Sequence, residues 1–115
     1  MKLWIDDLRP APAGYTWVKT VNDAKWYIGS AEEIEELFPT GTPVIKLIDL
    51  DHDAGDYRAA GGDYINILNW LEYRQHSQNG KVYPIRIHSF NPVGCVNMRA
   101  IIERNGWEEV YYCMH

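Results

Sequence analysis

Short runs of apolar residues alternate along the chain with longer segments of helical periodicity. The apolar runs cover residues 2–6, 15–19, 44–50, 81–88 and 107–112. Runs of this length, rich in β-branched and aromatic side chains, are typical of the buried strands of a parallel sheet. The pattern therefore predicts five strands.

Two short helices are predicted in the first long segment between strands. Thr20 or Asn22 can cap a helix over residues 23–28, and Gly29 interrupts it. A capping-box pattern then opens a second helix over residues 30–38. The connection between the second and third strands should therefore be a broken helical crossover.

The remaining segments predict two further helices and a loop. Apolar periodicity indicates a helix over residues 63–76, and Asn91-Pro92 and Asn105-Gly106 are typical start and stop signals for the other. Residues 8–14 contain two prolines and a glycine and cannot sustain a helix. Strands that alternate with helices predict one α/β domain over residues 1–115, with three α/β/α layers and a mainly parallel five-stranded sheet.

Composition narrows the class of function. A net charge of −5 argues against gripping long DNA by phosphate neutralisation, although one nucleotide or an RNA end stays possible where a cation mediates the contact. No apolar stretch approaches membrane-spanning length, and Met1-Lys2 opens no signal peptide. Cys95 and Cys113 fit neither a zinc site nor a disulfide framework. A cytoplasmic protein with free thiols is the expectation.

Acidic residues follow two of the predicted strands. Asp6 and Asp7 end the first strand, and Asp49 and Asp51 end the third. Ligands of open α/β sheets bind beyond the carboxyl ends of the strands, so these carboxylates should meet at one edge. Adjacent like charges repel unless a cation lies between them, which makes all four candidate ligands for Mg²⁺ or Mn²⁺. The structural alternative is that they only cap the strand and bond loop amides.

Two histidines also lie at predicted strand ends. His52 lies between Asp51 and Asp53, and His88 ends the fourth strand beside a serine. Two imidazoles across one phosphodiester can divide the general-base and general-acid roles. We therefore regard His52, His88 and Asp51 as catalytic candidates, with Asp51 or Asp53 orienting an imidazole.

The segment after the fourth strand resembles an anion site. Ser89 is followed by Asn91-Pro92, which places a helix N-terminus beside the strand end. Arg9 could clamp phosphate oxygens in a fork, or it could be a solvated loop residue. Arg9, Ser89 and Asn91 are thus the phosphate-binding candidates.

Taken in order, three motifs resemble a known family. An acidic pair after the first strand, an aspartate after the third and a hydroxyl residue after the fourth match response-regulator receiver domains. More specifically, the chain resembles the cyclic-phosphate processing receiver-like domains, through the segments Trp4-Ile5-Asp6-Asp7-Leu8-Arg9-Pro10, Leu50-Asp51-His52-Asp53 and His88-Ser89-Phe90-Asn91-Pro92-Val93-Gly94.

That resemblance implies a receiver (flavodoxin-like) topology, here with a degenerate first helix. It also implies a link to RNA repair and the handling of a cyclic phosphate on an RNA end or a small nucleotide. By motif, the implicated positions are Asp6, Asp7, Arg9, Asp51, His52, His88, Ser89 and Asn91.

Departures from the phosphorylated receivers leave alternatives open. Those domains carry a lysine after the fifth strand, whereas residues 108–112 are followed here by Cys113. A metal-assisted phosphoesterase is the leading hypothesis. A non-catalytic receiver-type signalling module, a nucleotide or metal sensor, and an interaction domain with a vestigial pocket are the alternatives.

Overall fold

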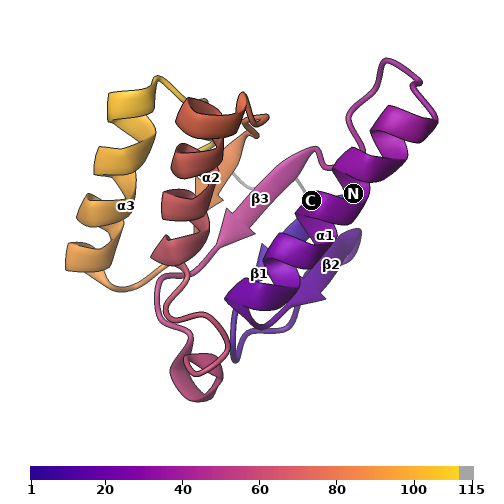
Figure 1. Ribbon diagram of the computed structural model, residues 1–115. Helices are drawn as coiled ribbons and strands as arrows, with labels where there is room; N and C mark the ends of the chain where they lie inside the picture. The colour runs from indigo at the N-terminus through magenta and orange to yellow at the C-terminus, as the bar shows by residue number, and fades with distance from the viewer. Residues whose placement is uncertain (112–115) are drawn as a thin grey trace.

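Four short strands form one fully parallel sheet in the computed structural model, which describes residues 1–111 (Figure 1). Their order across the sheet is β2-β1-β3-β4. The strands are β1 (Lys2–Ile5), β2 (Tyr15–Val18), β3 (Leu47–Leu50) and β4 (Ile85–Ile87). The predicted parallel α/β fold is confirmed, and this strand order is that of a receiver topology.

Three α-helices and one 3₁₀ turn connect and follow the strands. They are α1 (Val21–Leu37), η1 (Gly55–Tyr57), α2 (Ile65–Gln78) and α3 (Pro92–Asn105). The predicted caps of α3 are confirmed: Asn91 accepts a hydrogen bond from the amide of Gly94, and Gly106 ends the helix with φ +66°. Thr20 caps α1 by accepting from the amide of Asp23.

The interruption predicted at Gly29 is wrong, because α1 runs through it without a break. Ala24, Ile28 and Ala31 are buried on one side of the helix, and Gly29 is exposed on the other. A single exposed glycine costs a helix only about 1 kcal/mol relative to alanine. Burial of the apolar side outweighs that cost, so the local signal is overridden.

The sheet has four strands, so the prediction of five overstates it. Residues 108–110 run beside β4, where the amide of Ile85 donates to the carbonyl of Glu108 and the amide of Val110 donates to that of Ile85. Only one parallel bridge, Ile85 to Glu109, results. Because β4 has only three residues, this edge offers little length for a further ladder. The last residue of the predicted strand, 112, and Cys113 lie outside the described residues.

The helices all lie on one face of the sheet, so the described residues form two layers and the predicted three-layer arrangement is wrong (Figure 1). The connections through α1 and α2 cross the sheet in the same direction, and right-handed crossovers then put both helices on the same side. Only the β1–β2 connection crosses in the other direction. It is the proline-containing loop, as predicted, so no helix covers the opposite face in this part of the chain.

Side-chain alternation along the strands separates the two faces. Leu3, Ile5, Ile48, Leu50 and Ile85 point into one apolar core shared with the three helices. The intervening residues of the strands point to the opposite face. None of the helices in the described part of the chain is both long and apolar enough to cross a bilayer.

Candidate functional site

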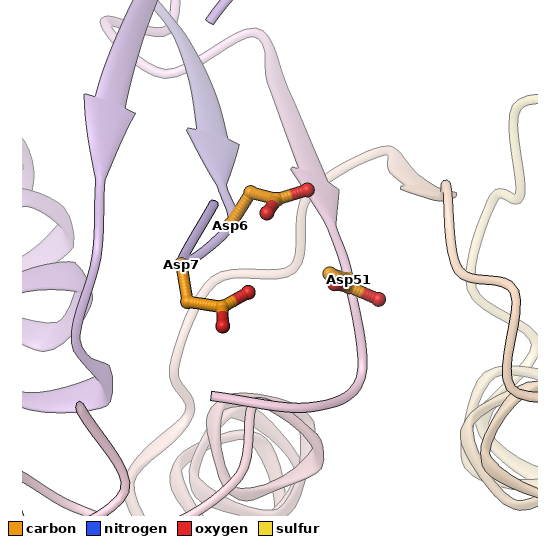
Figure 2. A group of neighbouring side chains, drawn as sticks. All are labelled: Asp6, Asp7 and Asp51. Carbon is orange, nitrogen blue, oxygen red and sulfur yellow. The ribbon is translucent and has the colours of Figure 1, made fainter. Parts of the chain in front are cut away.

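Three aspartates meet at the carboxyl edge of the sheet. The register pairs Ile5 with Leu50, so the residues that follow β1 and β3 emerge side by side. Asp6, Asp7 and Asp51 each offer an oxygen within 4.8 Å of the others, and Figure 2 shows them around a common space. We call these three residues the acid cluster; its assembly at this edge follows the sequence prediction.

The acid cluster borders a surface cavity of about 400 Å³, which we call the acid hollow. Residues after β1, β3 and β4 supply its walls, and two apolar side chains, Leu8 and Phe90, stand at it 78% and 89% exposed. It is lined by Asp6, Asp7, Leu8, Arg9, Asp51, Asp53, Ser89, Phe90 and Asn91. Four carboxylates thus face one guanidinium.

Asp6 is buried and saturated with hydrogen bonds. Its Oδ1 accepts from the amides of Leu8 and Arg9, each at 2.9 Å. Its Oδ2 accepts from Arg9 Nε at 2.8 Å and contacts His88 Nε2 at 2.9 Å. Burial alone would raise the pKa of Asp6, but the two amides, His88 and Arg9 outweigh it and hold that pKa below its usual value. Since a carboxylate has about four acceptor sites, Asp6 has none to spare.

Asp7 has the opposite electrostatic setting. Partial burial raises its pKa, and the negative charges of Asp6 and Asp51 raise it further. The loop that carries η1 packs directly on this carboxylate, because a Cβ at Gly55 would overlap Asp7 Oδ2. Gly55 also has a positive φ of +55°. A glycine is therefore required here both by the conformation and by the close approach.

Arg9 contacts residues that follow all three strands β1, β3 and β4. Besides Asp6, its Nη2 contacts Asp51 Oδ2 at 3.2 Å and donates to the carbonyl of His88 at 2.7 Å. Its guanidinium lies 5.0 Å from the ring centroid of Phe90. Arg9 therefore lines the acid hollow as predicted, but its Nε and Nη2 are already engaged by the protein.

His52 lies behind one wall of the acid hollow. Its Nδ1 contacts Asp53 Oδ1 at 2.9 Å, and Asn91 Nδ2 lies 3.3 Å from the other oxygen of Asp53. The imidazole packs against Gly94 in α3, where a Cβ would come within 2.5 Å of the ring. The hydrogen bond from His52 lowers the pKa of Asp53. His52 thus reaches the hollow through Asp53.

His88 lies deeper, on the face of the sheet that no described helix covers. Its Nδ1 contacts Asp49 Oδ1 at 2.6 Å, its Nε2 contacts Asp6, and its ring stacks on Trp4 with centroids 3.7 Å apart and planes 4° apart. Asp49 is fully buried and also accepts from Arg86 Nη1. The structure therefore does not bring Asp49 into the acid cluster, and His88 does not line the acid hollow.

The remaining phosphate-binding candidates lie where the sequence predicts. Ser89 and Asn91 both line the acid hollow. Ser89 Oγ accepts from the amide of Asn91, and Asn91 Oδ1 caps α3. Their positions put the N-terminus of α3 beside the acid cluster.

Two supporting residues escaped the sequence prediction, Arg86 and Trp4. For Arg86, the sequence offered one indication, its place in the fourth predicted strand. In the β3–β4 register Arg86 pairs with Asp49, so two residues of opposite charge lie on the same face of neighbouring strands. Such a pair inside a predicted sheet indicates a buried ion pair. Trp4 carried no comparable signal.

The donor set of the acid cluster fits Mg²⁺. This ion takes one or two carboxylates, several waters and substrate phosphate oxygens, as opposed to a full cage of protein ligands. Asp7 and Asp51 would supply the oxygens. Asp51 accepts from the amide of His52 through Oδ1 and contacts Arg9 through Oδ2, which leaves each oxygen a further acceptor site, whereas Asp6 would have to release a hydrogen bond. Burial and the charges of Asp6 and Asp51 raise the pKa of Asp7, and a bound cation would offset those charges.

Comparison with known protein families agrees with the receiver fold and with the location of the acid hollow. No match was found among the curated proteins or among the solved structures that were searched. A family described as the cyclic-phosphate processing receiver domain matches residues 1–104, which include every residue of the acid hollow. This chain belongs to the cyclic-phosphate processing receiver domain family.

Proposed function

We propose that this protein opens a cyclic phosphate on a nucleotide or an RNA end, with Mg²⁺ or Mn²⁺ held in the acid cluster. The carrying observation is the meeting of Asp6, Asp7 and Asp51 beside the N-terminus of α3. Carboxylates for a divalent cation and a helix N-terminus for an anion are the two elements that phosphate chemistry needs. Membership in the family supports the same reaction class.

The proposed reaction is a hydrolysis. Water adds to phosphorus, one ring P–O bond breaks, and the released sugar oxygen takes up a proton, which leaves a phosphomonoester. A divalent cation bound here would supply Lewis-acid polarisation of a phosphoryl oxygen. Asp7 and Asp51 would hold it, and Asp6 would keep Arg9 and the loop backbone in place.

The chain's own groups would bind the phosphoryl group and move protons. Ser89 lines the acid hollow and can donate its hydroxyl to a phosphoryl oxygen. Pro92 has no N–H and the amide of Gly94 donates to Asn91 Oδ1, so Val93 would supply the amide of the first turn of α3 toward an anion. His52 contacts Asp53 through Nδ1, which leaves Nε2 for proton exchange. His88 has a carboxylate at both ring nitrogens, so we assign it a positioning role toward Asp6 in place of the predicted proton exchange.

The test is a turnover assay. Purified protein with Mg²⁺ or Mn²⁺ is incubated with 2′,3′-cyclic nucleotides and with short RNAs that end in a 2′,3′-cyclic phosphate. We expect ring opening that chelation abolishes and that Asp7→Asn and Asp51→Asn each reduce by at least about a hundredfold. Absence of turnover on every substrate would overturn the enzymatic proposal. Retention of full activity in both variants would overturn the site.

A receiver-type switch is the second candidate. Asp51 directly follows β3, Asp6 and Asp7 follow β1, and Ser89 follows β4, which is the receiver layout. Acetyl phosphate labelling followed by mass spectrometry of the intact protein tests it. A phosphoryl adduct on Asp51 that Asp51→Asn abolishes would favour the switch over the esterase.

A further inference from the structure

A second cavity lies at the same edge of the sheet, one strand further along. It measures about 530 Å³, and half of the residues around it are aromatic. We call it the aromatic hollow; it is lined by Trp17, Val18, Lys19, Thr20, Asp23, Trp26, Tyr27 and Tyr57. The proposed chemistry of the acid hollow uses none of these residues.

The aromatic hollow presents ring faces. Lys19 Nζ lies 4.4 Å from the ring centroid of Trp17 and 5.8 Å from that of Tyr57. An ammonium group in such positions lies over the π faces, so both rings turn a face toward a shared space. A flat aromatic ligand could stack on these faces by displacing the Lys19 ammonium from them.

Trp26 adds a third ring, which is not part of the hydrophobic core. It is 64% exposed on α1, and Tyr27 holds it in an edge-on contact with centroids 5.0 Å apart and planes at 81°. Tyr27 itself packs against the core. Trp26 is therefore held on a rigid support while most of its surface stays available to a ligand.

The aromatic hollow adjoins the acid hollow through two direct links. Trp17 Nε1 donates to the carbonyl of Asp6 at 2.8 Å, and the β1–β2 register places Lys19 next to Asp6. On the other side, η1 starts at Gly55, which packs on Asp7, and ends at Tyr57, which lines the aromatic hollow. Neighbouring strands lie about 5 Å apart, so one small ligand can reach both sites.

We propose that the aromatic hollow binds the nucleobase of the nucleotide whose cyclic phosphate occupies the acid hollow. This inference rests on the proposed function and names its substrate class: a base-bearing cyclic nucleotide or RNA 3′ end, as opposed to any cyclic phosphodiester. The ribose spans the step from Asp6 to Trp17. The base stacks among Trp17, Trp26 and Tyr57, and Lys19 contributes positive charge beside it.

Binding measured by calorimetry with and without a base tests the proposal. The probes are 2′,3′-cyclic AMP, a dinucleotide that ends in a 2′,3′-cyclic phosphate, and glycerol 1,2-cyclic phosphate, which has no base. Stacking on an aromatic side chain contributes about 1–3 kcal/mol per base, which corresponds to roughly 5- to 150-fold in affinity. We expect Trp26→Ala to lower the affinity ratio of 2′,3′-cyclic AMP over the base-free probe by about tenfold.

Tyr73→Ala is the matched control, because Tyr73 is another exposed aromatic residue, 60% exposed on α2, that lines neither hollow. It should leave the ratio unchanged, and a urea midpoint for each variant checks folding. A ratio unchanged in Trp26→Ala and in Tyr57→Ala would overturn the base site, even if cyclic phosphates are turned over. Loss of nucleotide binding in these variants without turnover of any substrate would support the base site and overturn the esterase.

The two nucleotide probes show which base occupies the aromatic hollow, the one that carries the cyclic phosphate or the one before it. Equal effects of Trp26→Ala on the mononucleotide and the dinucleotide support a site for the base that carries the cyclic phosphate. An effect confined to the dinucleotide would overturn that assignment, because the aromatic hollow would then hold the preceding base.

Discussion

His88 bridges Asp6, at the acid hollow, and Asp49, which is buried within the sheet. Its two ring nitrogens lie 2.9 Å from Asp6 Oδ2 and 2.6 Å from Asp49 Oδ1. Carboxylate oxygens only accept, so any hydrogen bond in these two contacts is donated by the imidazole of His88. The three side chains form a buried chain of contacts, Asp6–His88–Asp49.

Removal of the bridge should destabilise the fold. We expect His88→Ala to lower the free energy of unfolding by about 3 kcal/mol, because Asp49 stays buried and keeps its contact with Arg86 but loses the one with His88. Urea denaturation measures this. His76→Ala, which removes a surface histidine whose Nε2 contacts Asn105, should cost less than about 1 kcal/mol. A loss at His88 no larger than that at His76 would contradict the buried chain.

Metal binding should depend on Asp7 and Asp51. We expect Asp7→Asn and Asp51→Asn each to weaken Mg²⁺ or Mn²⁺ binding by at least about tenfold, since they supply the available oxygens. Titration calorimetry gives the affinities. Asp56→Asn is the control because Asp56 is exposed on η1 and lines neither hollow. Equal affinities in all three variants would exclude the acid cluster as the metal site.

Gly94 should tolerate no side chain. A Cβ there would lie 2.5 Å from the His52 ring, so Gly94→Ala must displace the imidazole from Asp53. We expect a loss of about 1–3 kcal/mol in stability. Gly29→Ala offers the matched comparison, because a Cβ on that helical glycine meets nothing within 4 Å and should stabilise α1 by up to about 1 kcal/mol. A stabilising Gly94→Ala would contradict the packing of His52 against α3.

Acid should weaken the contact between α2 and α3. Hydrogen bonds from Arg104, together with Asn105, lower the pKa of Glu72 to about 2 from an ordinary 4.5. A depressed folded-state pKa stabilises the fold above the unfolded-state value, and this contribution is lost as the pH falls toward 2. The stability difference between the wild type and Glu72→Gln should therefore be constant from about pH 7 to 5. It should then shrink progressively as the pH falls from about 4.5 toward 2.

Urea midpoints between pH 7 and 2.5 measure this difference. Glu36→Gln, which removes an exposed carboxylate from α1, serves as the control. A Glu72→Gln difference as large at pH 3 as at pH 7 would show that the charge of Glu72 does not hold the two helices together.

Local signals predicted some parts of this structure well. The limits of α3 follow from Asn91-Pro92 and Asn105-Gly106, because capping depends on a few adjacent residues. The meeting of Asp6 with Asp51 follows from the parallel pairing of β1 and β3, which the apolar runs already indicate. Both features need only short-range information and one topological rule.

Features that depend on tertiary packing were out of reach. The sequence placed Asp49 and Asp51 together at the end of the third predicted strand, but β3 ends at Leu50, between the two. Asp51 therefore reaches the acid cluster, while Asp49 stays inside the sheet, opposite Arg86. Likewise, only the packed core shows that α1 continues through Gly29.

The stacking of Trp4 on His88 gives the molecule an intrinsic optical reporter. The indole lies parallel to an imidazole whose far nitrogen contacts the floor of the acid hollow. A ligand that displaces Asp6 would change the electric field at the indole of Trp4. We therefore expect ligand occupancy to alter the emission of Trp4, one of five tryptophans in the chain, without a dye or label.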